Sequence, residues 1–370
     1  MDVFSTIGHK GFDSYSGSLW RTLLFKPKSL NNFEDGKLVH KSTLLMNFNH
    51  AITDGFSNLL IFDLFIKILN KVIQDEEVDD TNNLVFSPAA ETLPYFTSIK
   101  DNLFSDKQQL ANCLEKYEKI LTNTCNLFSQ KIIHRNADSS KADLIVNEIG
   151  EKETSNFLKK CKIENVTVNS AFISLINLSI LETLRVNKLI GENSGWEIPS
   201  GQVENLRKYY SDDRKNSIGC QVSAGFFKIY TDKDDLQDFW EYTRKVQREF
   251  KDYCNSGEMI RFEIARMLLQ LQNKIPNADF KTQNKVATYY GLTNMGDASK
   301  VLKNKEKSVK ILNILRYSSV YNTSYPLGYF IQTFEKRFTY TIVFNTQHID
   351  KNLVHDIDKK TKEIFKNISN

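Results

Sequence analysis

The segment 54–75 constrains the fold more than any other, because its apolar residues surround most of a helix instead of forming one stripe. Asp54 is a good N-cap for this helix, since its carboxylate can accept a backbone N–H of the first turn. The apolar positions are Phe56, Leu59, Leu60, Phe62, Leu64, Phe65, Ile68, Leu69, Val72 and Ile73. Polar and charged residues interrupt this run, so it is too polar to span a membrane. The pattern therefore predicts a core helix that is buried on several sides.

The rest of the chain alternates between strand and helix signals. Apolar runs bounded by turn residues predict strands at 18–26, 38–49, 129–134, 142–149, 218–230, 286–293, 307–316 and 336–346. Helical periodicity predicts helices at 99–122, 151–162, 170–186, 234–253, 257–273 and 351–367. Strands and helices mixed in this way are typical of an α/β or α+β layered fold, not of a helical bundle or a β-sandwich.

Composition and charge exclude several classes of protein. The chain has 370 residues, of which 41% are hydrophobic, so a globally disordered chain is excluded. This length corresponds to about two domains or to one large composite domain. The 49 basic and 45 acidic residues are interspersed, so the sequence has no basic stripe that would bind a nucleic acid.

Cysteine and histidine usage indicates a cytoplasmic protein without a metal site. The five cysteines are widely spaced and form no CxxC pair, which argues against a disulfide framework and a zinc site. A reducing compartment is the default for such a chain. The N-terminus has no apolar run behind a basic segment, so no signal peptide is expected. Five histidines show no metal-like spacing: His9, His40, His134, His348 and His355.

The residues with the most chemical information lie between the strand 38–49 and the helix 54–75. His50 follows the strand, and Asp54 and Gly55 come four and five residues later. Histidine titrates near neutral pH and suits general-base catalysis, and a glycine beside it lets a substrate approach the backbone closely. A plainer interpretation is that Asp54 only caps the helix and that His50 is a hydrogen-bonded core histidine. These residues alone leave both interpretations open.

Several short segments resemble the CoA-dependent acyltransferase superfamily, which includes chloramphenicol acetyltransferases, alcohol acetyltransferases, plant BAHD acyltransferases and condensation domains of nonribosomal peptide synthetases. The segment from His50 to Gly55 resembles the HxxxDG motif of that group. Other segments are similar to its PLWR strand, its TvN helix start, its NLR…lGn.vs segment and its SNlG strand. They occur in the family's order, at Ser18–Arg21, Val166–Ala171, Asn205–Arg207 with Ser217–Ser223, and Thr293–Gly296.

The resemblance implies a fold of two chloramphenicol-acetyltransferase-like lobes, each a mixed sheet flanked by helices, with a channel between them. It implies an N-terminal lobe over residues 1–95, a crossover helix over 96–128 and a C-terminal lobe over 129–370. His50 lies closer to the N-terminus than is usual in the family, so we expect an incomplete N-terminal lobe. Its sheet should have fewer strands than that of the C-terminal lobe, and one face of the helix 54–75 should be exposed.

The resemblance also implies an activity, the transfer of an acyl group from acyl-CoA to a small-molecule alcohol or amine. Acyl-CoA would be a co-substrate and not a bound cofactor. His50 would take the proton of the acceptor as the acceptor attacks the thioester carbonyl. Arg207 stands at the position that pairs with Asp54 in the family. A bidentate pair of this kind would hold the turn and so orient His50.

Further site residues follow from the same resemblance. Thr293 or Asn294 would donate a hydrogen bond to the oxyanion that forms at the thioester carbonyl. Gly55 and Ser57 would contact the substrate, although a serine in the first turn of a helix often has only a structural role. Cys220 is interpreted as a buried structural thiol.

Two alternatives from other functional classes remain. Condensation domains usually carry a second histidine before the catalytic one, at a position where this chain has Asn49. This difference favours an alcohol-acetyltransferase-like activity over a carrier-protein-dependent condensation domain. A chain with an incomplete N-terminal lobe would alternatively serve as a binding or scaffold module without catalysis. An open channel that reaches His50 would favour the enzyme.

Overall fold

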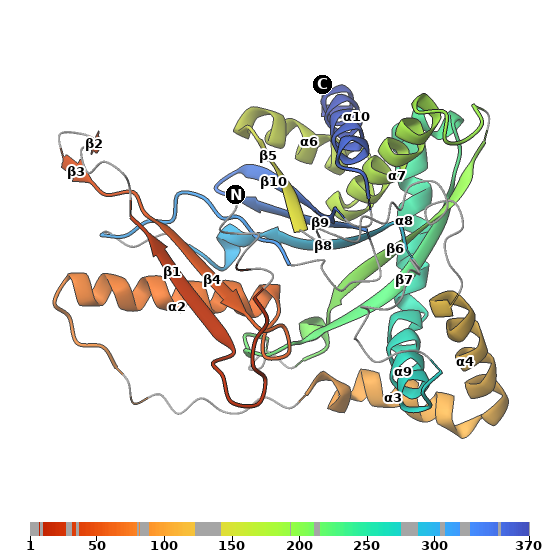
Figure 1. The fold of residues 1–370 in the computed structure, drawn as a ribbon, viewed down its shortest axis with the longest axis horizontal. Helices are drawn as coiled ribbons and strands as arrows, with labels where there is room; N and C mark the ends of the chain where they lie inside the picture. Colours follow the sequence, from red (N-terminus) through yellow and green to blue (C-terminus); the bar gives the residue numbers. More distant parts are fainter. Residues whose placement is uncertain are drawn as a thin grey trace.

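The structure is a computed structural model that describes most of the chain. The described residues are 7, 10–26, 32–34, 37–79, 81, 89–122, 142–192, 194–210, 215–274, 288–303, 308–318, 326–346 and 349–369. They form a larger part, built on a wide sheet with helices around it, and a smaller part, in which one long helix lies beside a two-stranded sheet (Figure 1).

The larger part is organised around a six-stranded mixed sheet with the order β5-β10-β9-β8-β6-β7. Its strands are β5 (Ala142–Ile149), β6 (Trp196–Asn205), β7 (Val222–Thr231), β8 (Tyr290–Asp297), β9 (Leu327–Phe334) and β10 (Arg337–Asn345). The β6–β8 and β8–β9 pairs are parallel, and the other pairs are antiparallel. Two of these strands, β6 and β9, were not predicted from the sequence, because Pro199 and Gly201 in β6 and Gly328 in β9 are residues that normally weaken strand signals.

Helices cover one face of this sheet and enclose the main hydrophobic core. They are α6 (Glu151–Ile163), α7 (Val168–Val186), α8 (Phe239–Asn255) and α10 (Lys351–Ser369). Thr167 caps α7, and fourteen residues of α7 are buried, so this helix lies at the centre of the core. Side chains alternate across a strand. In β9, Tyr329 and Ile331 accordingly face this core, while Phe330 belongs to a separate cluster.

A second helical layer packs against α9 (Glu258–Leu271), which itself lies on β7. The sequence predicted one helix over 99–122 here, but the structure has two, α3 (Pro94–Ser105) and α4 (Lys107–Thr122). The break falls at Asp106, whose backbone is extended. Its carboxylate caps the start of α4 by accepting from the N–H groups of Gln108 and Gln109. Short 3₁₀ turns complete the described elements: η1 (Ala90–Thr92), η2 (Leu206–Tyr209), η4 (Asp234–Leu236) and η6 (Ala298–Lys300).

The smaller part contains far less sheet, as expected. Strand β1 (Trp20–Phe25) pairs antiparallel with β4 (Thr43–Phe48), and β2 (Asn32–Glu34) forms a separate pair with β3 (Lys37–Val39). Among the described residues, the β1–β4 sheet therefore has two strands, compared with six in the larger part. The predicted strand 38–49 is divided between β3 and β4. The predicted strand at 129–134 lies outside the described residues, and the domain boundaries near 95 and 128 stay predictions.

Helix α2 (Gly55–Ile73) is buried on one face only. Leu59 and Phe62 pack against residues of β8, η6 and the segment 308–318. Leu64, Ile68 and Val72 lie on another face and are 52%, 37% and 59% exposed. The expectation of burial on several sides is therefore wrong, because the two-stranded sheet and the segment 308–318 together cover too little of the helix. The expectation of an exposed face is confirmed.

This exposed stripe of α2 predicts self-association of the protein. Replacing Leu64, Ile68 and Val72 together with glutamine should raise the monomer fraction, because glutamine keeps helix propensity while removing a contiguous apolar surface. Light scattering coupled to size-exclusion chromatography measures this fraction. Lys67→Gln, an exposed change on the same helix, is the control and should leave it unaltered. A wild-type protein that stays monomeric at every concentration contradicts the prediction.

The predicted strand 307–316 is not a strand in its described part, 308–316. This segment instead connects α2 to the open face of the six-stranded sheet. The Asn70 side chain accepts from the N–H groups of Ser308 and Val309, at 3.0 and 2.8 Å between heavy atoms. Gln332 on β9 donates to the Ile314 carbonyl at 2.7 Å. Side chains thus satisfy backbone groups that a neighbouring strand would otherwise satisfy.

A helix that crosses a bilayer must be both long and apolar. Within the described ranges, no single helix has the length and apolar character to cross a membrane. The pair α6 and α7 reaches that length and apolar character only when the two helices are taken together, and they are bent by 105° relative to each other.

Candidate functional site

His50 lies in a tight turn directly after β4. The Asn49 N–H donates to the Leu19 carbonyl at 2.8 Å and so extends the β1–β4 pairing up to the turn. The Asn49 side-chain oxygen then accepts from the Ala51 N–H at 2.9 Å, and its carbonyl accepts from the Ile52 N–H at 3.2 Å. His50 is exposed in this turn. The imidazole is thus accessible to solvent, whereas its access through a channel between two lobes, which the family resemblance implies, stays a prediction.

Asp54 forms both the cap and the ion pair that the sequence left as alternatives. Its Oδ1 accepts from the Ser57 N–H at 2.8 Å, which is the N-cap of α2. Its Oδ2 accepts from Arg207 Nη1 at 2.7 Å and from the Gln221 N–H at 2.8 Å. The side chains of Asp54 and Arg207 are 1% and 4% exposed. The predicted contact is confirmed. The expected bidentate geometry is wrong, because Arg207 Nη2 donates to the Ser57 hydroxyl and Asp54 Oδ1 caps the helix.

Arg207 is held by more than the carboxylate. Its Nε and Nη2 donate to the Ser217 carbonyl at 3.3 and 3.1 Å, and its guanidinium lies 5.0 Å from the centre of the Phe56 ring. A carboxylate, carbonyl oxygens and an aromatic face together compensate for the desolvation of a buried guanidinium. This set of contacts fastens the first turn of α2 to the chain between η2 and β7.

Ser57 is part of this buried arrangement and does not reach a substrate surface. Its side chain is inaccessible to solvent. Its hydroxyl accepts from Arg207 Nη2 at 2.7 Å and from the Gly219 N–H at 3.0 Å, and it donates to the Gly219 carbonyl at 2.8 Å. The expected substrate contact of Ser57 is wrong, because all hydrogen-bonding positions of the hydroxyl are used inside the protein. Ser57 and Asp54 instead clamp the backbone on both sides of Cys220.

Cys220 lies beside His50, although the sequence pattern gave it only a structural role. Its Sγ lies 3.7 Å from His50 Nδ1, and the residue is exposed, so the interpretation as a buried structural thiol is wrong. Protein atoms still crowd the sulfur. This desolvation, together with the negative charge of Asp54, raises the pKa of the Cys220 thiol. The group beside the imidazole is therefore a neutral thiol at neutral pH.

Gly55, the first residue of α2, makes a close approach to the larger part. A Cβ atom at this position would lie 2.8 Å from Met295 Sδ and 3.1 Å from Arg316 Nη1. The missing side chain thus gives a packing reason for a glycine here. Contact between Gly55 and a substrate stays a prediction.

Thr293 and Asn294 lie on β8, and other side chains hold both of them. Arg316 donates from Nη1 to Thr293 Oγ1 and from Nη2 to the Thr293 carbonyl, each at 3.3 Å. Asn294 Nδ2 donates to Asn169 Oδ1 on α7 at 3.3 Å. The structure therefore brings together the segments that resemble the family's TvN and SNlG motifs. Arg316 belongs to none of the segments that resemble the family. Only its contact with Thr293 in the folded chain makes it a candidate site residue.

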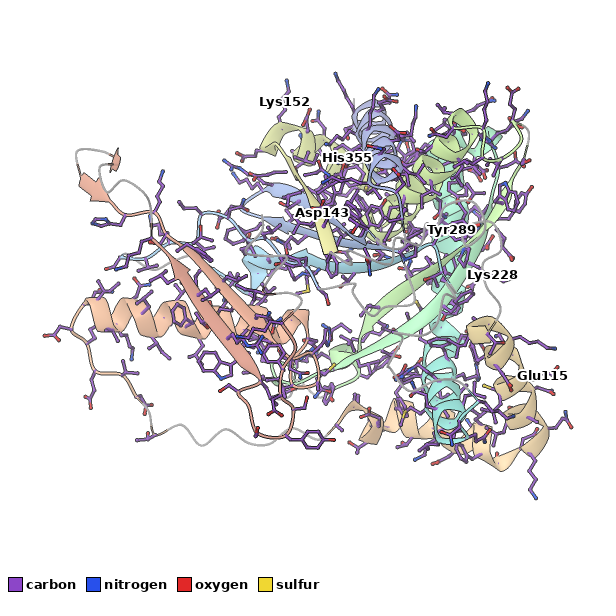
Figure 2. All side chains as sticks on the ribbon, in the orientation of Figure 1. Glu115, Asp143, Lys152, Lys228, Tyr289 and His355 are labelled. Atoms are coloured by element: carbon purple, nitrogen blue, oxygen red, sulfur yellow. The ribbon has the colours of Figure 1, made fainter. Side chains whose placement is uncertain are left out.

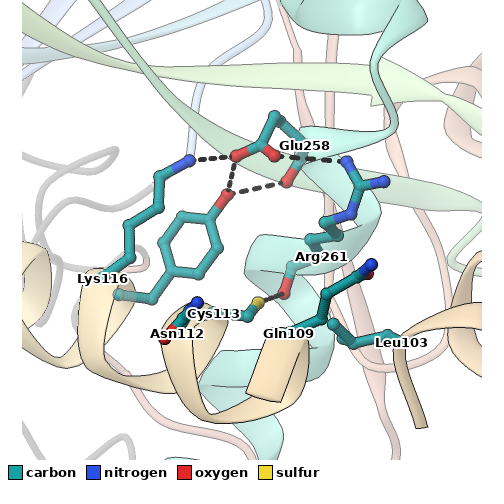
Figure 3. Close-up of a pocket in the computed structure, with 8 residues that line it drawn as sticks. Leu103, Gln109, Asn112, Cys113, Lys116, Glu258 and Arg261 are labelled. Carbon is teal, nitrogen blue, oxygen red and sulfur yellow. Dashed lines mark hydrogen bonds and ion pairs between the residues drawn. The ribbon is translucent and has the colours of Figure 1, made fainter. Parts of the chain in front are cut away.

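A cavity of about 210 Å³ lies elsewhere, between α3, α4 and α9 (Figure 3). Glu258 is its main acidic group, and it contacts Lys116, Tyr117 and Arg261. Burial alone would raise the pKa of Glu258, but the hydrogen bonds from Lys116 and Tyr117 outweigh it and lower the pKa. Its charge is thus already balanced inside the protein, and none of the lining residues belongs to the site around His50.

Metal binding needs several ligating side chains that lie close together. Among the residues that the structure describes, no group of three or more histidine, cysteine, aspartate or glutamate side chains is placed to hold a metal ion. His355 projects from α10 on the helical side of the larger part, away from α2 (Figure 2). His9, His134 and His348 lie outside the described residues.

Comparisons with known proteins were made by sequence and by structure. No protein-family model matches the sequence, and no curated protein matches it significantly. Solved structures do match. The trichothecene 15-O-acetyltransferase TRI3 from Fusarium sporotrichioides is 11% identical with a TM-score of 0.66, over 95% of this chain and 71% of that protein.

Two other similar structures are domains of tyrocidine synthetase B and of a polyketide synthase. The epimerization domain from the third module of tyrocidine synthetase B has a TM-score of 0.58 and 12% identity, over 89% of this chain and 68% of that one. The condensation domain of the Monacolin K polyketide synthase MokA has a TM-score of 0.56 and 12% identity, over 97% of this chain and 74% of that one. At such identities the likeness establishes the fold alone. This chain therefore has the two-lobed mixed α/β fold that condensation domains share with acyltransferases.

Proposed function

We propose that this protein transfers an acyl group from a thioester to an alcohol or amine, with His50 as the general base. The observation that carries the proposal is that an exposed His50 lies in a turn that is followed by Asp54 and Ser57, both of which are hydrogen-bonded to the larger part. A general base must be both accessible and held in place. The fold shared with acyltransferases adds support.

In the proposed reaction, His50 accepts the proton of the acceptor as its oxygen or nitrogen attacks the thioester carbonyl. A new C–O or C–N bond forms, and the carbonyl π electrons move to the oxygen. The Thr293 hydroxyl is proposed to donate a hydrogen bond to that oxyanion. The intermediate then collapses, the C–S bond breaks, and the leaving thiolate takes the proton from His50. All atoms and charges balance without a redox partner.

The donor proposed first is acyl-CoA, acting as a co-substrate. Asn49 supports this choice over a carrier-bound thioester, because condensation domains usually carry a second histidine at this position. The carrier-protein alternative rests on the synthetase and synthase domains among the similar structures. A non-catalytic scaffold is the third possibility. A reducing cytoplasmic setting is part of the proposal.

Free thiol release from acyl-CoA tests this function. The full chain is incubated with acetyl-, hexanoyl- and palmitoyl-CoA, with and without a panel of alcohols and amines. We expect release that depends on the acceptor, with an ester or amide as the second product by mass spectrometry. A parallel set offers the same acyl groups on a phosphopantetheinylated carrier protein. Transfer from the carrier alone would replace CoA as the donor, and no transfer from either donor would leave the scaffold function.

A further inference from the structure

Arg316 is a guanidinium without a carboxylate partner in the part of the chain that the structure describes. It projects from the segment 308–318 over the sheet face opposite the main core, 5.4 Å from the centre of the Phe330 ring. Its only described hydrogen bonds are the two long ones to Thr293. Its Nε is buried and has no hydrogen-bond partner among the described residues. Arg316 is partly exposed as a residue, but a buried side-chain nitrogen without a partner is uncommon in folded proteins, so this arrangement needs an explanation.

Arg316 brings a second positive charge to the first turn of α2, in addition to that of Arg207. Asp54 is the carboxylate there, and Arg207 already balances it at 2.7 Å. Arg316 Nη1 approaches the same turn from the other side, next to Gly55. The N-terminal end of the helix adds a partial positive charge. Burial lowers the pKa of Arg316 to about 10, and the negative charge of Asp54 acts in the opposite direction, so Arg316 stays charged at neutral pH.

The hydrogen bonds of Thr293 indicate where this charge acts. A hydroxyl group has one proton to donate and two positions at which to accept. Because Thr293 Oγ1 accepts from Arg316, its own proton is left for another acceptor. A cationic donor to the oxygen also polarises the O–H bond and makes it a stronger donor. The Thr293 hydroxyl can therefore donate its proton to a ligand while its oxygen accepts a hydrogen bond from the positively charged Arg316.

We propose that Arg316 is a positioning residue that acts through Thr293. It supplies the positive charge that stabilises the oxyanion formed when the acceptor adds to the thioester carbonyl. A negative oxygen beside Thr293 exists only during the reaction, so the stabilisation by Arg316 is larger for the transition state than for the bound substrate. This inference rests on the proposed acyl transfer and deepens it.

Steady-state kinetics of four variants test the proposal, using the acyl-CoA and acceptor with the highest wild-type rate of thiol release. Arg316→Met should lower kcat about tenfold to a hundredfold with little change in KM, because losses of oxyanion stabilisation fall on kcat. Thr293→Val should have a similar effect. The double variant should be no worse than the poorer single variant, because the two residues act as one unit. Arg316→Lys keeps the charge and should retain more activity than Arg316→Met.

Arg337→Met is the matched control, because Arg337 is an exposed arginine on β10 that pairs with Glu148. It should leave kcat and KM unchanged. Thermal unfolding monitors the fold of each variant. If Arg316→Met does not fold, Arg316→Lys and Thr293→Val decide, since a normal kcat in both overturns the proposal.

Three further outcomes would overturn the role of Arg316. A kcat for Arg316→Met within twofold of the wild type, or additive losses in the double variant, would leave it a structural contact. A rise in KM alone would mean that it binds a permanent negative group of the substrate. In each case the proposed acyl transfer stands, because the wild type is active. A wild type without thioester-dependent transfer would overturn both proposals together.

Discussion

Replacing His50 with alanine is expected to lower the turnover of acyl transfer by about two to four orders of magnitude, the usual contribution of a general base. The fold should stay intact, because His50 is exposed in a turn that Asn49 already stabilises. Acceptor-dependent thiol release measures the turnover, and circular dichroism checks the fold.

His355→Ala serves as the control for this variant. His355 is an exposed histidine on α10, so its loss removes an imidazole without touching the candidate site. We expect it to behave as the wild type. Thiol release by the His50→Ala protein at the wild-type rate would exclude His50 as the base. Cys220, whose Sγ lies 3.7 Å from His50 Nδ1, would then be the next residue to test.

The second large effect is expected from Asp54→Ala, which removes the carboxylate between the two parts of the protein. It leaves the Arg207 guanidinium buried without its anion, which typically costs about 3–5 kcal/mol. It also removes the N-cap of α2, a contribution of about 1 kcal/mol. Urea denaturation should show this loss in the free energy of unfolding, and activity should fall with it.

Asp54→Asn separates the two roles of Asp54. An asparagine still accepts from the Ser57 N–H and caps the helix, but it lacks the charge that balances Arg207. We expect a smaller loss of stability and a clear loss of activity, because the turn that carries His50 is less firmly held. Full activity of this variant would reduce Asp54 to a helix cap.

Asp63→Ala is the matched control on the same helix. Asp63 pairs with Lys67, whose side chain is 56% exposed, and partly exposed pairs of this kind contribute less than about 1 kcal/mol. The contrast between positions 54 and 63 therefore compares a buried pair that also caps the helix with a partly exposed pair that does not. An equal loss at both positions would contradict the importance of the buried pair.

Elements whose signals are local were predicted well. Asp54 marked the start of α2, because a short oxygen-bearing side chain caps a helix wherever that helix lies. Strands β7 and β10 also follow the predicted ranges closely. The segment 308–316 failed as a strand, since a strand exists only when another strand supplies its hydrogen bonds. Here the side chains of Asn70 and Gln332 supply some of them instead.

The sequence by itself therefore determined the local chemistry, which includes the cap at Asp54, the turn at His50 and, through family resemblance, the pairing of Asp54 with Arg207. Only the tertiary structure decided that Ser57 is buried, that Cys220 lies against His50 and that Arg316 reaches Thr293 beside Gly55. Ser57 and Arg207 are 150 residues apart, and Cys220 and His50 are 170 residues apart. Contacts over such separations depend on how whole elements pack, and no local pattern of residue types records them.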